Sequence, residues 1–297
     1  MKLSLEKRRW LWAYAFLALP FLFFLLIRIA PTLYAFNVSL HDWDPIALEH
    51  PFVGLKNFQQ LGDDKVFWAA MRNTWLYVLI TVPVSLILSL LVALGLQRLT
   101  RFVGFYRLLY FIPYVTSLVA VSWVWRWLYA SNGVFNEVLR GIGIRPQRFL
   151  LGPDQALPSI VAMTVWQGLG FQIIIFLAGL EGIPETFHEA AMLDGANDWQ
   201  RFRHITLPLL NPTIVFLTVV GVIGSLQLFT QIRNMSSQGQ GGPLNSTISL
   251  VLYVYRLAFD SLPSRMGYGS AITVVLFVMI LIITIVQLKV LTRRYEY

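Results

Sequence analysis

Six stretches of this 297-residue chain are apolar, contain no Asp, Glu, Lys, Arg or His, and are about as long as a bilayer is thick. A helix needs about 20 predominantly apolar residues to cross the hydrocarbon core, because it rises only about 1.5 Å per residue. The sequence therefore predicts an all-α, polytopic membrane protein with six transmembrane helices. Bounded by the nearest charges or helix breakers, the predicted spans are residues 10–27, 73–97, 108–125, 155–180, 212–232 and 266–288.

The composition agrees with this prediction and argues against several other classes of protein. Of the residues 57% are hydrophobic and 13% are charged, whereas a soluble domain carries about a quarter charged residues. Because the chain has no cysteine, it forms neither disulfides nor thiolate metal sites. The net charge of +8 comes from basic residues that flank apolar runs. This placement favours membrane lipid, and not nucleic acid, as their partner.

The basic residues around the first apolar run predict the orientation. Lys2, Lys7, Arg8 and Arg9 precede that run, and positive charges beside the first span usually stay in the cytoplasm. The start resembles a signal peptide, but the apolar run is too long and no small-residue cleavage site follows it. With an even number of spans, both termini are expected in the cytoplasm. Outer loops are then expected at residues 37–72, 126–154 and 233–265.

Two shorter apolar pieces, residues 32–40 and 248–255, fail the length test for a span. The second follows the Gly-rich stretch "QGQGGPLNST" and is predicted to be a re-entrant or surface helix. The "GQGG" of residues 239–242 lacks the Lys and Ser/Thr of a phosphate-binding loop. We expect a flexible turn there.

The chain has none of the usual parts of an enzyme. No P-loop motif occurs, and His41, His50, His188 and His204 are scattered without metal-ligand spacing. We therefore expect no catalytic residues, no metal site and no cofactor in this chain. Transport is the class that remains, but proton- or sodium-driven carriers usually place a charged group near the membrane midplane. Because the predicted spans hold none, the energy is expected to come from another subunit.

Uncharged polar residues inside the spans indicate a cavity or contacts between helices. Gln167 and Gln172 lie in the fourth span, and Ser225, Gln227, Thr230 and Gln231 in the fifth. Amides beside aromatic rings suit a neutral, polyhydroxylated solute, but they also form interhelical hydrogen bonds worth roughly 0.6–2 kcal/mol. For a single glutamine both explanations stand. For the group of Gln167, Gln227, Trp166 and Phe229 we favour a cavity.

A polar block between the fourth and fifth spans, "HEAAMLDGANDWQRFRHITLPLLNP", has helix signals of its own. Pro184 can open a helix, and Asp194-Gly195-Ala196 stops it with glycine at the usual C-terminal position. Asn197 or Asp198 can cap a second helix that ends at Leu207-Pro208. Each helix has about ten residues and is about 15 Å long, too short to span. Large apolar side chains in the block are expected to contact the membrane domain and a partner's groove.

This block resembles the EAA loop of binding-protein-dependent ABC importer permeases. The similarity extends to "WLYASNGVFNEVLRGIGI", "GGPLNSTISLVLYVY", "MGYGSA" and the "RRYEY" tail. These segments are similar to sugar-type permeases of the maltose and glycerol-phosphate transporter (MalF/UgpA) class, from about residue 73 onward. The residues that carry the loop resemblance are Glu189, Ala190, Ala191, Asp194, Gly195, Ala196, Phe202, Ile205, Leu207 and Pro208.

The resemblance implies a type I ABC importer permease fold with a cytoplasmic coupling helix between spans four and five. Its partners would be a second homologous permease, two ATPase subunits that bind ATP and Mg, and an extracytoplasmic solute-binding protein. Residues 1–72 would form the N-terminal tail, first helix and outer loop, and 73–297 the transmembrane domain with its coupling loop at 184–210. The location implied is a bacterial or archaeal cytoplasmic membrane. Candidate solute-binding residues, by motif position, are Trp166, Gln167, Gly170, Phe171, Gln227 and Phe229.

The solute implied is a sugar, oligosaccharide, polyol or glycoside. The alternative within this class is glycerol 3-phosphate, which would require basic residues that the spans do not offer. Outside the class, a self-sufficient channel or secondary carrier and a membrane anchor or sensory scaffold remain open; the interior amides argue against the scaffold.

Overall fold

The computed structural model of the protein describes residues 4–99 and 101–291 and is helical throughout, apart from turns and one isolated bridge between His41 and Phe52. Lys2 and the "RRYEY" tail, used above for orientation and resemblance, lie outside the described residues. The chain divides into two compact units. One comprises Met1–Asp63 and Val254–Val275, and the other Asp64–Tyr253 and Leu276–Tyr297.

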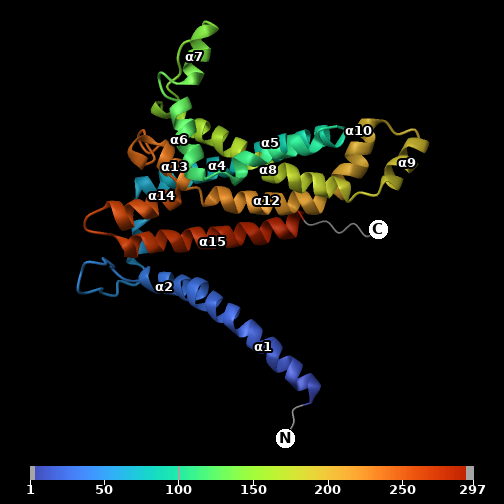
Figure 1. Cartoon of the computed structure of the whole chain (residues 1–297). Helices are drawn as coiled ribbons and strands as arrows, with labels where there is room; N and C mark the ends of the chain where they lie inside the picture. The colour runs from blue at the N-terminus through green and yellow to red at the C-terminus, as the bar shows by residue number, and fades with distance from the viewer. Residues whose placement is uncertain (1–3, 100, 292–297) are drawn as a thin grey trace. The chain divides into compact units, whose positions relative to one another are not determined.

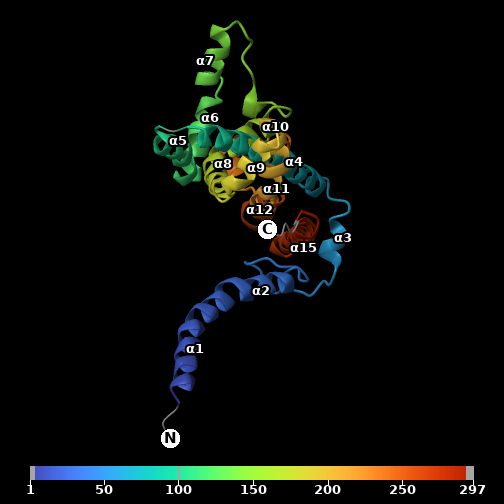
Figure 2. The same ribbon diagram turned by 90° about the vertical axis from the view of Figure 1, so that its right-hand side faces the viewer.

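The first unit begins with one continuous helix that is longer than predicted. Helix α1 (Leu5–Phe24) passes through a π-helical turn, η1 (Leu25–Ile29), into α2 (Ala30–Val38), as Figures 1 and 2 show. The prediction that the span stops at residue 27 and that residues 32–40 are a separate piece was wrong. Pro31 removes one backbone donor, the widened turn accommodates it, and the Thr32 hydroxyl donates to the Arg28 carbonyl at 2.7 Å. Helix geometry thus continues past the charge that ended the predicted span.

The rest of the first unit is a loop followed by short helices. Asn57 of α3 (Lys56–Gln60) donates to the carbonyls of Ser39 and His41, at 2.9 and 3.0 Å. The unit also contains η5 (Arg256–Asp260) and the first turns of α15 (Met266–Leu291). Gly267 lies so close to this loop that a methyl group there would be 2.1 Å from the His41 carbonyl oxygen.

The second unit contains the remaining helices. In the described chain four helical stretches are long and apolar enough to span a membrane, and the number rises to six if each of two bent helix pairs, residues 103–128 and 198–226, counts as one span. The helices of this unit are α4 (Lys65–Gln97), α5 (Val103–Val115), α6 (Leu118–Leu128), α7 (Val134–Gly141), η2 (Phe149–Leu151), α8 (Ala156–Glu181), α9 (Glu185–Leu193), α10 (Asp198–Arg201), η3 (Phe202–Thr206), α11 (Leu207–Leu209), α12 (Asn211–Leu226), α13 (Thr230–Met235), η4 (Ser237–Gly239), most of α14 (Leu250–Tyr255) and the later turns of α15.

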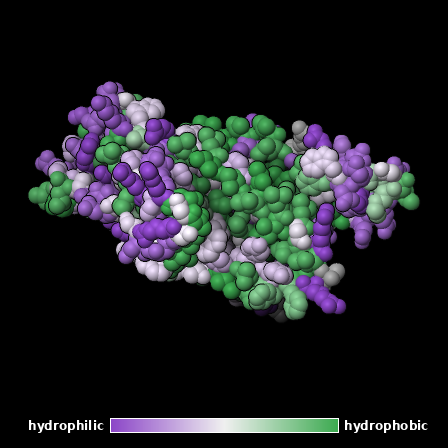
Figure 3. Space-filling model, turned by 90° about the horizontal axis from the view of Figure 1, so that it is seen from above, coloured by the Kyte–Doolittle hydropathy of each residue, from purple (hydrophilic) through white to green (hydrophobic). Residues whose placement is uncertain are grey.

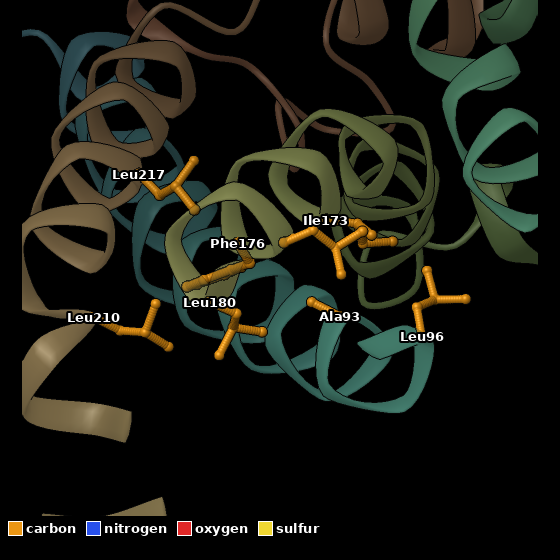
Figure 4. Packing of buried hydrophobic residues seen from close by; sticks show 8 residues of the cluster. Ala93, Leu96, Ile173, Phe176, Leu180, Leu210 and Leu217 are labelled. Atoms are coloured by element: carbon orange, nitrogen blue, oxygen red, sulfur yellow. The ribbon is translucent and has the colours of Figure 1, made fainter. Parts of the chain in front are cut away.

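Helices α4, α8 and α12 form the core of this unit (Figure 4). Its buried residues are Ala93, Leu96, Ile173, Phe176, Leu177, Leu180, Leu210 and Leu217. Gly179 of α8 allows α12 to approach, because a methyl group there would lie 2.5 Å from the Thr213 hydroxyl. In Figure 3 apolar side chains occupy the middle of the visible face and hydrophilic ones gather at its ends, as expected for a bundle that crosses a bilayer.

Two predicted spans are not straight. The third is divided into α5 and α6, which meet at 95°, because Thr116 has an extended backbone conformation and Ser117 is also non-helical. The fifth is helical over Asn211–Leu226, is interrupted at residues 227–229 and resumes as α13 at Thr230. The second short helix does not end at Leu207-Pro208, as predicted, but continues to Leu209 and bends by 63° into α12. A π turn, η3, precedes Pro208 and accommodates the proline within the helical run.

Candidate functional site

The break between α5 and α6 leaves a backbone carbonyl without a helical partner, and α8 supplies a donor. The Gln167 amide donates to the Tyr114 carbonyl at 3.4 Å, a long hydrogen bond. The Tyr114 ring stacks on Phe171, with centroids 5.2 Å apart. Non-helical backbone inside a membrane protein is tolerated where neighbouring groups or water in a cavity satisfy it. Gln167 and Phe171 therefore lie at the first break.

A second break, at residues 227–229, separates α12 from α13. Gln227 is exposed and Phe229 has neither helical nor regular extended backbone angles. The carbonyl of Leu228, between them, accepts a 2.6 Å hydrogen bond from the Ser249 hydroxyl. Ser249 in turn accepts from the backbone N–H of Leu252 at 3.2 Å and so caps α14. The two predicted solute-binding residues of this span flank an opened backbone segment.

The helices that follow the two breaks pack together. Helix α13 contacts both α6 and α8, and Arg126 of α6 donates to the Asn234 carbonyl of α13 at 3.2 Å. On α8, Trp166 lies 5.3 Å from Trp125 of α6, measured between ring centroids. The helices next to the two breaks are therefore in contact with one another. They carry or adjoin Trp166, Gln167, Phe171, Gln227 and Phe229.

Gly170, the remaining candidate for solute binding, lies at a close crossing of α5 and α8. A methyl group at this position would be 2.1 Å from the Tyr110 carbonyl oxygen and 2.9 Å from the Phe111 Cα. These are backbone atoms that cannot move aside alone. Gly170 therefore holds the first break close to Gln167 and Phe171.

Gln172, two residues after Gly170 on α8, forms an interhelical network. Its amide nitrogen donates to the Ser85 hydroxyl at 3.1 Å, and its oxygen accepts from the Ser89 hydroxyl at 3.0 Å. Both serines belong to α4. Of the two explanations that the sequence left open for a single glutamine, contact between helices holds for Gln172.

Sequence reasoning missed a set of polar side chains on α4 that anchor the Gly-rich loop. Asn73 donates to the carbonyls of Asn245 and Ile248 at 2.8 and 3.1 Å, and the Tyr77 hydroxyl donates to that of Thr247 at 3.0 Å. These contacts join residues 170 or more positions apart.

A pattern that was present in the sequence could have found this face of α4. Buried polar residues recur there every four positions, which places them on one side of a helix. They are Asn73, Tyr77, Thr81, Ser85 and Ser89, followed by Ala93.

The Gly-rich segment is packed and not an open turn. Gly239 and Gly241 are buried, both with positive φ, and a methyl group on Gly241 would lie 2.7 Å from the Ile248 Cα. The Ser236 hydroxyl accepts from the Gly241 N–H at 2.9 Å. The helix predicted after it, at 248–255, is confirmed as α14, which begins two residues later than predicted.

The polar block folds as two short helices with the predicted turn. Helix α9 ends at Leu193, and Gly195 has φ +79° while the Ala196 N–H bonds to the Ala191 carbonyl at 2.9 Å. This pairing is the glycine-dependent helix stop expected from the sequence. Asn197 caps α10 and exchanges hydrogen bonds with Gln200, a complete capping box.

The residues of the EAA-like motif are distributed over this block as follows. Glu189, Ala190 and Ala191 lie on α9, Asp194 ends it, Phe202 and Ile205 lie in η3, and Leu207 and Pro208 in α11.

Most of α9 is uncovered in this chain. No residue of Glu185–Leu193 is buried, and Leu193 and Trp199 are 91% and 65% exposed. The block is fixed to the bundle at its end, where Leu210 and Thr206 are buried, and through an exposed ion pair between Arg98 and Asp198 at 3.8 Å. Large apolar side chains on a short, rigid, exposed element are typical of an interaction surface.

Comparisons with known proteins agree with these features. Residues 66–297 match the family described as "Binding-protein-dependent transport system inner membrane component". The chain is 35% identical over 267 residues to the lactose transport system permease protein LacF of Rhizobium radiobacter, covering 89% of this chain and 88% of that one. It is also 35% identical over 267 residues to the trehalose/maltose transport system permease protein MalF of Thermococcus litoralis, covering 90% and 88%.

The fold is that of solved ABC importer permeases. A chain of a bacterial ABC transporter involved in the import of the acidic polysaccharide alginate superposes with a TM-score of 0.81 at 25% identity, covering 96% of this chain and 98% of that one. The family match and the structural match both identify a permease of an ABC importer. The chain belongs to the binding-protein-dependent transport system inner membrane components, as a multi-pass permease of the ABC importer type.

Proposed function

We propose that this chain is the permease subunit of an ATP-driven importer that carries a neutral sugar, oligosaccharide, polyol or glycoside across the cytoplasmic membrane. The observation that supports the solute class is the chemistry at the two breaks. Gln167 and Gln227 offer amides, Tyr114 a phenol and Phe171 a ring, and none of the four is an Asp, Glu, Lys, Arg or His. Amides bond sugar hydroxyls while rings cover the apolar faces.

The names of similar permeases support the same class. Relatives transport lactose, trehalose/maltose and, in Bacillus subtilis, arabinooligosaccharides. The last is 32% identical over 279 residues. A phosphorylated solute is disfavoured because a phosphate would require cationic partners near the breaks. Two basic side chains by the breaks are already engaged: Arg126 is bonded to the Asn234 carbonyl and stacked on Trp123, and Arg233 donates to the Gly239 carbonyl.

Energy enters, in this proposal, through the exposed block of α9 and α10. Alternating access needs an element that transmits force from an ATPase, and α9 offers an uncovered apolar and acidic surface that is joined to α12 through α10, η3 and α11. One of two ATPase subunits would bind this surface, and a second permease would complete the pair. Both chain termini and this block would face the cytoplasm, and a solute-binding protein would dock on the opposite side.

A reconstituted system tests the solute class. The chain is assembled with its partner permease and ATPases in liposomes, and uptake of radiolabelled lactose, maltose, an arabino-oligosaccharide and glycerol 3-phosphate is measured with the cognate binding protein present. Mass spectrometry of the ligand that co-purifies with this binding protein extends the panel. We expect ATP-dependent uptake of a neutral saccharide. Uptake of glycerol 3-phosphate alone, or ATP-independent uptake by the chain without ATPases, contradicts the proposal.

The coupling role is tested by Glu189→Lys, with Glu185→Lys one turn earlier on α9 as the matched control. Both side chains are exposed, so neither change should prevent insertion. We expect Glu189→Lys and Gly195→Val to abolish the stimulation of ATP hydrolysis by solute-loaded binding protein, because valine is strained at φ +79°. Equal coupling in Glu189→Lys and wild type, or equal losses in the two lysine variants, contradicts the assignment.

A further inference from the structure

Helix α7 forms the exposed side of a rigid hairpin between α6 and α8. Buried Asn136 holds the hairpin closed: its amide donates to the carbonyls of Ala130 and Gln147, at 3.1 and 3.2 Å, and its oxygen accepts from the Gln147 N–H at 2.8 Å. The end of the helix is capped by a bond from the Ile144 N–H to the Leu139 carbonyl across Gly143, whose φ is +77°. The surface of this hairpin is therefore fixed in shape.

The outward face of α7 is apolar. Val134 and Val138 of α7 lie on one face, and Ile142, the residue that caps its C-terminus, continues the four-residue spacing. Val138 and Ile142 are 57% and 66% exposed. On another side of the helix Glu137 pairs with Arg140. An exposed aliphatic stripe with charged groups beside it is the pattern of a helix that lies in a membrane interface.

Helix α6, which precedes the hairpin, carries exposed tryptophans of the kind found at a membrane interface. Trp123 and Trp127 of α6 are both more than half exposed and lie one turn apart. The guanidinium of Arg126 sits 4.9 Å from the centre of the Trp123 ring. Tryptophan is enriched where membrane spans reach the head groups. The base of the hairpin thus has the side chains of a membrane–water boundary.

The placement of α7 agrees with that depth. Helix α8 has 26 residues and is about 39 Å long, so its two ends reach opposite sides of a bilayer. The α7 hairpin precedes α8 and the α9–α10 block follows it. In Figure 1, α7 runs across the direction of α4, α8 and α12, as a helix in the plane of the membrane would.

We propose that α7 is an interfacial helix that binds the bilayer surface on the side opposite to the α9–α10 block, with its aliphatic stripe among the acyl chains. The ligand is anionic phospholipid. Arg140, Arg145 and Arg148 are exposed on the hairpin, against two exposed acids, Glu137 and Asp154. Within the described chain neither Arg145 nor Arg148 makes an ion pair. Their guanidinium groups bond the phosphate oxygens of head groups.

Nitroxide accessibility tests the depth of the helix. The chain has no cysteine, so Val138→Cys, Ile142→Cys and the control Glu137→Cys each introduce the only thiol of this subunit. Each full-length variant is spin-labelled, assembled with its partner subunits and placed in nanodiscs of phosphatidylcholine and phosphatidylglycerol. We expect oxygen, which concentrates in hydrocarbon, to relax the labels at 138 and 142 more than a water-soluble nickel chelate does. At 137 the order is reversed.

Two results overturn the proposal. Labels at 138 and 142 that are as accessible to the nickel chelate as the label at 137 place the stripe in water. Shielding that arises only when the solute-binding protein is added, or that is lost when the chain is placed in nanodiscs without the partner permease, assigns the stripe to a protein interface.

The lipid charge is tested separately. Nanodiscs of phosphatidylcholine alone are compared with those containing phosphatidylglycerol, for wild-type arginines and for the Arg145→Gln/Arg148→Gln variant, each with the label at 138. We expect phosphatidylglycerol to shift the wild-type label deeper and to have little effect on the variant. Each arginine is expected to contribute about fivefold to anionic-lipid preference. The same shift in both chains overturns the head-group assignment.

Discussion

Replacing Ser249 by alanine removes one hydroxyl that stabilises two elements. It donates to the Leu228 carbonyl at 2.6 Å, in the break between α12 and α13, and it caps α14 by accepting from the Leu252 N–H at 3.2 Å. Ser249 is fully buried, so water is not at hand to replace either bond. The substitution therefore leaves one acceptor and one donor without their partner.

The size of the loss follows from these two bonds. An N-cap serine replaced by alanine costs about 1 kcal/mol, and a buried carbonyl left without a donor costs about 1–3 kcal/mol. The sum is a loss of about 2–4 kcal/mol in the free energy of unfolding. The break at residues 227–229 also loses the Ser249 hydroxyl as a donor, so solute uptake should fall together with stability.

A nearby serine provides the matched control. The Ser246 hydroxyl is buried and has no hydrogen-bond partner among the described residues, so Ser246→Ala removes no bond and is expected to change stability by less than about 0.5 kcal/mol. Both variants are unfolded in mixed lipid–detergent micelles by titration with denaturing detergent. Equal midpoints for the two variants would refute the role assigned to Ser249.

Three further predictions concern the contacts of α8 and α4. Gly170→Ala should lower the free energy of unfolding by about 1–3 kcal/mol or more, because the added methyl group pushes α5 away. The control Gly168→Ala has nothing within 4 Å of the added methyl group and should be neutral or stabilising. Equal thermal stability of the two purified variants would contradict this. Gln172→Leu should cost about 0.6–2 kcal/mol of unfolding free energy and leave the KM for solute unchanged, and a raised KM would instead place Gln172 in the solute site. Asn73→Ala should increase hydrogen exchange in residues 244–250 about tenfold or more, because two buried loop carbonyls lose their donor; unchanged exchange would show that other contacts hold the loop.

The sequence was sufficient to predict the elements that depend on local chemistry. Charge-free apolar runs overlap the four straight candidate spans and the two bent helix pairs. Gly195 and Asn197 located the turn between the two short helices, because a helix stop and a cap are set by a few adjacent residues. The family of the chain followed from the same block.

What the sequence did not predict depends on partners far along the chain. Thr116 and Ser117 are ordinary residues for an apolar span, and their break is satisfied by Gln167 of another helix. The anchoring of the Gly-rich loop joins Asn73 to residues more than 170 positions away. The first helix was cut short for a different reason: hydropathy stops at Arg28, whereas backbone hydrogen bonding continues through the π turn. Whether the candidate solute residues bind solute stays a prediction.

The way α4 holds the Gly-rich loop has a consequence for altering this protein. Asn73 and Tyr77 donate to main-chain carbonyls of the loop, and the Thr74 hydroxyl accepts from the Leu250 main-chain N–H at 3.1 Å. Main-chain groups are present whatever residue occupies a position. The attachment is therefore indifferent to the identity of the exposed loop residues, such as Leu244. Segments transplanted from homologous permeases into residues 243–246 should seat in the same place, which makes this loop a natural point for recombination between transporters.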